Sequence, residues 1–270
     1  MSLPAAPPVA GSAAGAASSA SPASKTILVL GATSAIANAF ARQRARDGAT
    51  LVLVARQAER LASIAADLVA RGAVRVETVA DDLSDMGSAE ARFAALLAKA
   101  GLPDEVLLAY GVLGEQAAAQ DSADETRRVI DVNFTSAALW LQLAAKHLAA
   151  DRKPRTLVVI GSVAGDRGRQ SNYVYGAAKA GLDAFAEGLA HRLHGTNLSV
   201  VTVKPGFVDT PMTAHLDRSG PLWAKPEAIA ADIDRAVAKG QRIVYTPWFW
   251  RPIMTAVRLA PRSLFYKTKL

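Results

Sequence analysis

The chain has 270 residues, a formal net charge of +7 and no cysteine. That length suits one large α/β domain with a sizeable core. The absence of cysteine excludes disulfides, thiolate metal ligands and a cysteine nucleophile, and it is compatible with a reducing cytoplasm. The four histidines form no zinc-ligand motif, so the composition argues against a metal enzyme.

Residues 1–24 consist almost entirely of Ala, Ser, Pro and Gly and carry no charge. A secretory signal needs a basic start and an unbroken apolar run, whereas prolines and glycines interrupt this segment. Its composition is typical of a disordered tail. Because no stretch of about twenty apolar residues follows, we expect a cytoplasmic protein without a membrane-spanning helix.

Apolar runs alternate with helical patterns between residues 25 and 246, the expected catalytic domain. The predicted strands cover residues 26–30, 51–55, 74–79, 105–110, 156–161, 198–203 and 242–245. The predicted helices include residues 59–70, 88–100, 125–149, 175–193 and 226–239. Continuously apolar strands are expected where helices cover both faces of a sheet. The alternation predicts a single doubly wound, Rossmann-like α/β domain whose parallel sheet has about seven strands.

The first predicted strand leads directly into a turn of small residues at 31–37 and then into a helix. A helix N-terminus in such a unit offers free backbone N–H groups and a positive dipole end to a pyrophosphate. Gly31 would let the chain turn tightly, and the small side chains of Ala35 and Ala37 would let the backbone approach a ligand. For this motif on its own, a turn that serves only packing is the alternative.

The second predicted strand ends at Arg56, where folds of this type that select NAD usually have Asp or Glu. An arginine suits the 2′-phosphate of NADP and can stack on adenine. A solvated arginine at a helix start is the alternative. After the third strand, Asp82 could accept from an adenine amino group or cap the next helix.

The most informative stretch of the sequence holds Ser162, Tyr175 and Lys179. Tyr175 and Lys179, at i and i+4, share a helix face, so the ammonium can lie near the phenol. A nearby cation lowers a tyrosine pKa, which would make the phenol a usable proton donor near neutrality. Ser162 ends a strand, where ligands gather in open α/β sheets. Tyr173 lies six residues from Lys179 and does not share that face.

Several motifs follow one another in the order of a known family. They are the turn at 31–37, Asp82-Leu83, Asn133, Ser162, Tyr175 with Lys179, and Pro205-Gly206 with Thr210. With these motifs, and with thirteen residues separating Ser162 from Tyr175, the sequence resembles the short-chain dehydrogenase/reductase family over residues 25–245.

The resemblance implies a role for each matching residue. Tyr175 would be the general acid of carbonyl reduction, Lys179 would bind the nicotinamide ribose and tune Tyr175, and Ser162 would orient the carbonyl. Asn133 would hold a water that links Lys179 to solvent. The implied contacts of the cofactor, NADP(H) in preference to NAD(H), are Gly31, Thr33, Ser34, Ala35, Ile36, Arg56, Asp82, Leu83, Gly111, Tyr175, Lys179, Pro205, Gly206, Val208 and Thr210.

Two segments depart from the family's pattern. Ala35 and Ala37 stand where members usually have glycine; both are expected at negative φ, where a methyl group is tolerated, but the affinity for the cofactor is left open. Residues 108–111, Leu-Ala-Tyr-Gly, replace the family's Asn-Asn-Ala-Gly. The side-chain hydrogen bonds that brace the sheet there must be replaced or lost.

Two further segments concern the substrate. Arg167 and Arg169 lie between Ser162 and Tyr175 and could face the same cleft as residues 206–226, where the family has its substrate-covering loop. Guanidinium groups there would suit a phosphate or a sugar, and a solvated, charged loop is the alternative.

The C-terminal appendage, residues 247–270, combines tryptophans with basic residues on a short apolar helix, and no acidic residue follows Asp234. This pattern is typical of an interfacial anchor attracted to anionic lipid. Packing into an oligomer interface or over the substrate pocket is the competing interpretation. With the run at 206–212, the appendage is similar to the branch that contains decaprenylphosphoryl-2-keto-pentose reductases, which reduce a keto-sugar on a polyprenyl phosphate.

The sequence therefore predicts an NADPH-dependent oxidoreductase that reduces a small-molecule or lipid-linked carbonyl, such as a keto-sugar. The alternative is a non-catalytic nucleotide-binding protein, regulatory or scaffolding, with the same fold. Neither a metal nor a nucleic acid is expected as a ligand. The family forms dimers and tetramers, chiefly through the helices at 125–149 and 175–193, so a homo-oligomer is expected. The appendage could also make peripheral contact with the inner face of the membrane.

Overall fold

Seven parallel strands form the central sheet of the computed structural model, which describes residues 24–268. The strand order is β3-β2-β1-β4-β5-β6-β9. The bounds are β1 Thr26–Leu30, β2 Thr50–Ala55, β3 Arg75–Ala80, β4 Glu105–Leu108, β5 Arg155–Ile160, β6 Leu198–Pro205 and β9 Ile243–Thr246. The predicted doubly wound sheet of about seven strands is confirmed. The tail predicted at 1–24 lies outside the described residues, apart from Ser24.

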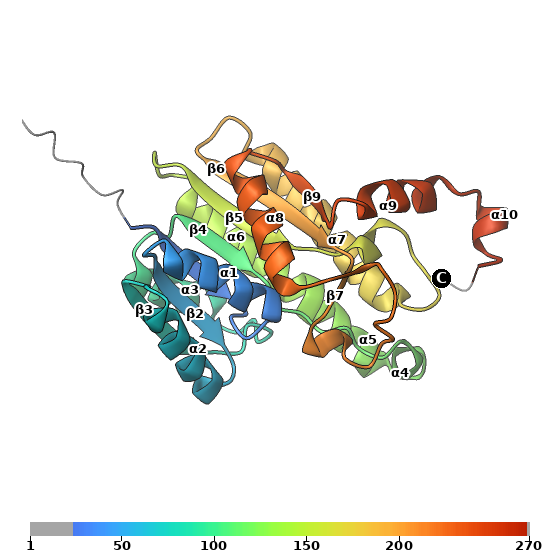
Figure 1. Cartoon of the computed structure of the whole chain (residues 1–270), viewed down its shortest axis with the longest axis horizontal. Helices are drawn as coiled ribbons and strands as arrows, with labels where there is room; N and C mark the ends of the chain where they lie inside the picture. Colours follow the sequence, from blue (N-terminus) through green and yellow to red (C-terminus); the bar gives the residue numbers. More distant parts are fainter. Residues whose placement is uncertain (1–23, 269–270) are drawn as a thin grey trace, which may run out of the picture.

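Helices cover both faces of this sheet (Figure 1). One face packs against α1 (Ala35–Arg46), α2 (Ala58–Ala70) and α8 (Pro226–Ala238), and the other against α3 (Ala89–Ala100), α6 (Ser136–Leu148) and α7 (Tyr173–Arg192). Alternate strand residues enter the two cores: Ile27 and Val29 face one, Leu28 and Leu30 the other, and all four are fully buried. Each such side chain contributes about 1.5–3 kcal/mol on burial, so the strand ends are held on a rigid support.

The helix predicted at 125–149 is wrong as a single element. The structure has α5 (Ala123–Ile130), a π-helical turn (Asp131–Thr135) and α6 instead. Asn133 explains the break, because its buried amide Nδ2 donates to Val129 O and to Val112 O, both at 2.8 Å. A side chain that bonds both its own preceding turn and a neighbouring loop disturbs the regular i→i−4 ladder.

Five small elements were not predicted, because each is too short for periodicity to reveal. They are α4 (Gln116–Asp121), two 3-10 turns (Val163–Asp166 and Pro211–Thr213), and the paired strands β7 (Phe207–Val208) and β8 (Trp223–Ala224). All five lie near the carboxyl edge of the sheet, in the segments that follow β4, β5 and β6.

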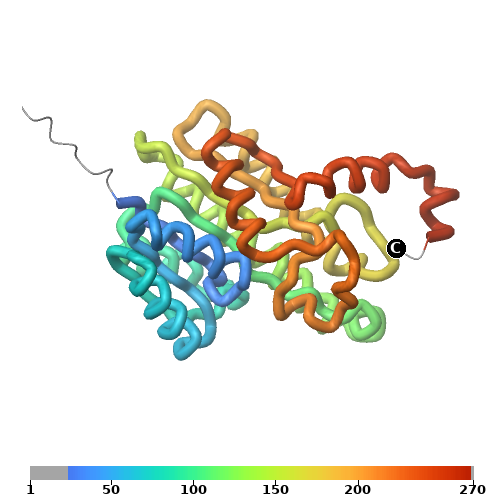
Figure 2. Tube along the Cα trace, in the orientation of Figure 1, coloured from blue at the N-terminus to red at the C-terminus, as the bar shows by residue number. Residues whose placement is uncertain are grey.

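The C-terminal arm, defined here as residues 249–268, contains two short helices rather than the single one predicted. These are α9 (Trp250–Leu259) and α10 (Arg262–Phe265), separated at Pro261, which cannot continue a helix. The arm extends from the body beside the segment that precedes α7, as the tube in Figure 2 shows. Within residues 24–268, no helix combines the length and apolar character that a bilayer crossing requires.

Candidate functional site

The phosphate-binding turn lies between β1 and α1, next to the point where the strand order reverses. Gly31 has φ +92°, and a Cβ there would lie 2.7 Å from Tyr110 Cβ, so only glycine fits. Ala35 and Ala37 are helical with negative φ, as expected. Ser34 precedes the helix and makes no capping side-chain hydrogen bond. The first backbone N–H groups of α1 therefore suit a pyrophosphate.

Three residues were expected around the adenosine: Arg56, Asp82 and Leu83. Arg56 is exposed at the end of β2. Asp82 Oδ1 accepts from Ser84 N at 2.9 Å and Ser84 Oγ at 2.6 Å, so this carboxylate makes a local turn and does not cap the next helix, α3, which begins at Ala89. Against the raising effect of burial, these bonds and the charge of Arg56 lower the pKa of Asp82. The side chain of Leu83 is buried in the core, and its carbonyl accepts from Trp140 Nε1. Only its backbone N–H is therefore left for a nucleotide.

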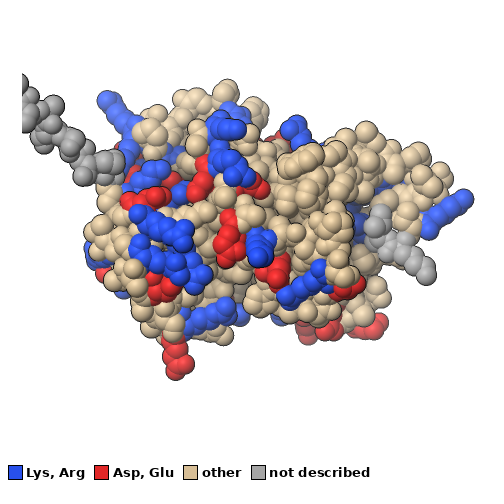
Figure 3. Space-filling view, viewed as in Figure 1, with Lys and Arg blue, Asp and Glu red and all other residues tan. Residues whose placement is uncertain are grey.

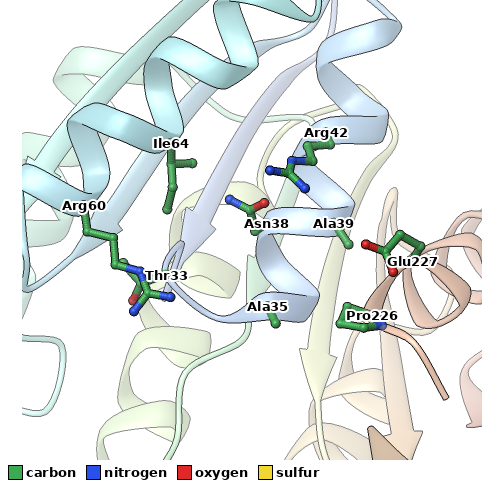
Figure 4. Close-up of a pocket in the computed structure, with 9 residues that line it drawn as sticks. All are labelled: Thr33, Ala35, Asn38, Ala39, Arg42, Arg60, Ile64, Pro226 and Glu227. Carbon is green, nitrogen blue, oxygen red and sulfur yellow. The ribbon is translucent and has the colours of Figure 1, made fainter. Parts of the chain in front are cut away.

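A second arginine, Arg60, was missed from the sequence although it follows Arg56 by one helical turn. It reaches toward Thr33 of the phosphate turn across an open cavity of about 280 Å³ (Figure 4). The cavity is lined by Thr33, Ala35, Asn38, Ala39, Arg42, Arg60, Ile64, Pro226 and Glu227. Arg42, on its rim, is paired with Asp67 at 2.8 Å.

The altered segment at 108–111 is braced by new contacts. Tyr110 OH and Ser136 Oγ are 3.0 Å apart, which ties the end of β4 to α6. Ala109 N donates to Leu30 O at 2.9 Å and keeps the strand edge in register. The bracing bonds expected from the family are therefore replaced here, largely by a tyrosine hydroxyl.

Gly111 brings two of the predicted catalytic residues together. A Cβ built on it would lie 2.6 Å from Asn133 Oδ1 and 3.7 Å from Lys179 Nζ, so its lack of a side chain lets both approach the same backbone. The Asn133 amide also accepts from Val112 N at 3.1 Å. Backbone groups therefore bond both the oxygen and the nitrogen of this amide, and the water expected at Asn133 stays a prediction.

Ser162, Tyr175 and Lys179 converge at the carboxyl end of β5. Ser162 follows this strand, and its Oγ accepts from Ala164 N at 3.1 Å. Lys179 Nζ is buried, donates to Ile160 O at 2.9 Å and lies 5.9 Å from the centre of the Tyr175 ring. Tyr173, by contrast, is 44% exposed at the first turn of α7, which agrees with its exclusion from the site.

The expected acidification of Tyr175 by Lys179 is wrong for this structure. Burial raises the pKa of Tyr175 to about 12, and hydrogen bonding with Ser162 and the charge of Arg169 only partly oppose this. Burial also lowers the pKa of Lys179 to about 8, although the charge of Asp183 raises it. Spacing on a helix predicted the proximity correctly but could not predict how strongly desolvation acts on both groups.

The segment after β6 carries the residues expected at the nicotinamide end. Pro205 ends the strand, Val208 is buried in β7, and Thr210 begins the 3-10 turn that follows. Gly206 packs directly under Trp250, since a Cβ there would lie 1.9 Å from the indole Nε1. No sequence pattern connects Trp250 with Gly206, because more than forty residues separate them.

Arg167 has a different role from the one considered for it. Its Nη1 donates to Val257 O and, at 2.8 Å, to Ala260 O, and its guanidinium lies 3.8 Å from the centre of the Phe265 ring. Arg167 therefore fixes the C-terminal arm to the segment between Ser162 and Tyr175, and it is not available for a substrate phosphate.

Comparisons with known proteins agree with this geometry. Residues 25–220 match the family model described as short chain dehydrogenase. The chain is 42% identical over 240 residues to an uncharacterized oxidoreductase of Mycobacterium tuberculosis, covering 88% of this chain and 95% of that protein.

Solved structures give the same result at the level of the fold. A short-chain dehydrogenase from Sphingobium yanoikuyae in complex with NADPH superposes with a TM-score of 0.77 and 25% identity, over 90% of this chain and 96% of that one. A short chain dehydrogenase/reductase from Burkholderia phymatum in complex with NAD gives a TM-score of 0.76 at 23% identity, over 86% and 92%. The chain belongs to the short-chain dehydrogenase/reductase family of NAD(P)-dependent oxidoreductases.

Proposed function

We propose that the protein is an NADPH-dependent reductase that converts a carbonyl to an alcohol, with Tyr175 as the general acid. The observation that supports this most is the convergence of Ser162, Tyr175 and Lys179 beside the phosphate-binding turn. A regulatory protein that only binds nucleotide would not need a phenol, a hydroxyl and a buried ammonium at one strand end. Hydride transfer to any carbonyl substrate would discard that alternative.

The chain's own residues have distinct tasks in this reaction. When bound, the nicotinamide cofactor supplies the hydride. Ser162 holds the substrate oxygen, and Tyr175, whose raised pKa keeps it protonated at neutral pH, donates its proton to that oxygen. Lys179 supplies a fixed positive charge beside the phenol and binds the ribose. Asn133 shapes the π turn along which the proton of Tyr175 is replaced from solvent.

The preference for NADPH is supported by the arginines at the adenosine end. Arg56 is exposed directly after β2, the strand that pairs with β1, and Arg60 lines the same cavity as Thr33 of the phosphate turn. Guanidinium groups suit a phosphate better than a ribose hydroxyl. The similar structure from Sphingobium yanoikuyae is a complex with NADPH, which is consistent with this preference. The similar structure from Burkholderia phymatum is a complex with NAD, so NAD is the alternative cofactor.

Replacing Arg56 and Arg60 together by alanine is expected to weaken NADPH binding by roughly 10²–10⁴-fold and to leave NADH binding nearly unchanged, because each of the two lost charge-assisted bonds contributes about 1.5–3 kcal/mol. Fluorescence titration with both nucleotides measures the difference. Arg42→Ala is the matched control, since Arg42 lines the same cavity but is paired with Asp67. Equal affinity of the parent protein for NADPH and NADH would refute the preference.

The substrate proposed is a keto-sugar or another carbonyl linked to a lipid, presented at an anionic membrane surface. Support comes from the C-terminal arm, which is docked beside the Ser162 segment yet leaves Leu259 and Leu264 exposed. Arg251, Arg258 and Arg262 are also exposed there, and Figure 3 shows the arm without an acidic group on the visible face. Apolar and basic groups on one short helical segment fit an anionic bilayer. A homodimer or homotetramer stays a prediction.

The full-length protein is expected to sediment with vesicles of phosphatidylcholine and phosphatidylglycerol, and much less with phosphatidylcholine alone. Leu259→Ser with Leu264→Ser should lower the vesicle partition coefficient by roughly tenfold for each leucine withdrawn from lipid. Val69→Ser with Val74→Ser removes two exposed apolar groups elsewhere and should change nothing. Equal sedimentation of the leucine variant and the parent would exclude the arm as the membrane contact.

A further inference from the structure

A buried cluster of charged side chains lies against the backbone that carries Ser162. Lys204, near the end of β6, pairs with Asp166, and its Nζ lies 3.0 Å from Asp183 Oδ2. Tyr245 of β9 donates to Asp166 Oδ2 at 2.8 Å. The side chains of Asp166, Lys204 and Asp183 are only 1%, 11% and 12% exposed. The reaction described above assigns no task to any of them.

Asp183 occupies space that two glycines leave open. A Cβ on Gly161 would lie 2.3 Å from Asp183 Oδ1, and a Cβ on Gly165 would lie 2.8 Å from Oδ2. The carboxylate therefore rests against the backbone on both sides of Ser162. Within residues 24–268, the Lys204 ammonium, 3.0 Å from Oδ2, is the one charged donor in contact with this carboxylate, and Oδ1 has no hydrogen-bond partner. Burying a carboxylate under these conditions is costly, so the neighbouring positive charges must offset the cost.

Lys179 is a second cation near this carboxylate. Its Nζ donates to Ile160 O, and Asp183 Oδ1 lies against Gly161, the next residue, although the two charged groups are not within 4.0 Å of each other. Lys179 precedes Asp183 by one turn of α7, so the two side chains share a helix face. Its ammonium is removed from solvent. Burial lowers the pKa of Lys179, and the charge of Asp183 is the influence that raises it.

We propose that Asp183 is a positioning residue that keeps the Lys179 ammonium charged and holds the Ser162 segment against α7. The effect on catalysis rests on the proposed reductase function, whereas the effect on Lys179 does not. The groups that face this pair from the packed elements are Lys204 on β6, Asp166 on the 3-10 turn (Val163–Asp166), Tyr245 on β9, and Tyr175 and Arg169 around the phenol.

The direction of the pH dependence follows from these charges. Burial raises the pKa of Asp183 to about 6, against the lowering effect of Lys204 and Lys179, so the carboxylate is ionised at neutral pH. Lys179 is half deprotonated at its pKa of about 8. Both members of the pair are therefore mainly charged midway between these two values, near neutral pH. Removing the carboxylate should move the upper boundary down, because a buried ammonium without a counter-ion deprotonates more easily.

The test compares Asp183→Asn with the parent in full-length protein labelled with ¹³C at lysine Cε. NMR titration follows the Lys179 resonance, which is assigned by its loss in Lys179→Met. We expect the midpoint to fall by on the order of one pH unit in Asp183→Asn, the lower end of the effect of an adjacent opposite charge. If carbonyl reduction is also measured, kcat/KM at pH 8.5 should fall by roughly tenfold, with little change at pH 6.5.

Asp166→Asn is the matched control. It removes a carboxylate from the same Lys204 cluster, but Asp166 contacts Lys204 and Tyr245 and does not lie one turn from Lys179 on α7, so the Lys179 midpoint should move much less than in Asp183→Asn. Asp183→Ser, which also removes bulk beside Gly161, is the second variant should the asparagine variant not fold, and the same shift is expected. An unchanged Lys179 midpoint in the Asp183 variants would overturn the proposal. Failure of the parent to reduce any carbonyl would instead count against the proposed function alone.

Discussion

Tyr175→Phe should reduce kcat/KM for NADPH-dependent carbonyl reduction by roughly 10²–10⁴-fold, the range typical of a lost general acid. The substitution removes one hydroxyl and leaves the ring, so the fold and nucleotide binding should persist. Since burial raises the pKa of Tyr175 to about 12, the phenol remains a proton donor across the neutral range. Steady-state oxidation of NADPH, followed by absorbance with saturating carbonyl substrate, measures the loss.

Tyr173→Phe supplies the comparison for this experiment. Tyr173 lies on the same helix two residues earlier, but it is 44% exposed and does not share the face of Lys179. Its variant should keep activity within about twofold, as expected for a surface change. A loss of only a few-fold in Tyr175→Phe would contradict the assignment of Tyr175 as the acid.

Trp250→Ala should lower the free energy of unfolding by about 3–5 kcal/mol, the usual cost of emptying a site filled by a large aromatic side chain. Trp250 is 5% exposed and packs with Val163 and Met254, and its indole covers Gly206. Its removal should therefore loosen the C-terminal arm and the segment after β6 together. Urea unfolding measures the stability, and limited proteolysis measures release of the arm.

Trp248→Ala provides the reference for the effect of removing an indole. Trp248 lies two residues before Trp250 but is 77% exposed, so its loss should change stability by no more than about 0.5 kcal/mol. If Trp248→Ala and Trp250→Ala are equally stable, the arm is not anchored through Trp250.

The sheet and the short-range features of the site were predictable from the sequence. Runs such as 27–30 are apolar without interruption, and this pattern is sufficient to predict a strand covered on both faces. Tyr175 and Lys179 are one turn apart, so helix geometry alone predicts that they are neighbours. Gly31 could be assigned to a turn because it directly follows a strand and precedes a helix.

Features that depend on distant segments could not be predicted in the same way. The π turn at Asn133 arises from a bond to Val112, which is twenty-one residues away. Lys204 and Asp183 each look like an ordinary charged residue in the sequence, and only the sheet brings them together. The pKa of Tyr175 depends on how completely the folded chain excludes water from the phenol, which no spacing rule contains.

Arg167 couples the C-terminal arm to the catalytic group. Because one guanidinium joins the loop between Ser162 and Tyr175 to the backbone at Val257 and Ala260, a truncation that removes these two residues would also remove the hydrogen bonds that this loop makes with the arm through Arg167. The same link implies that, across homologues, replacement of Arg167 and replacement of its stacking partner Phe265 should occur together.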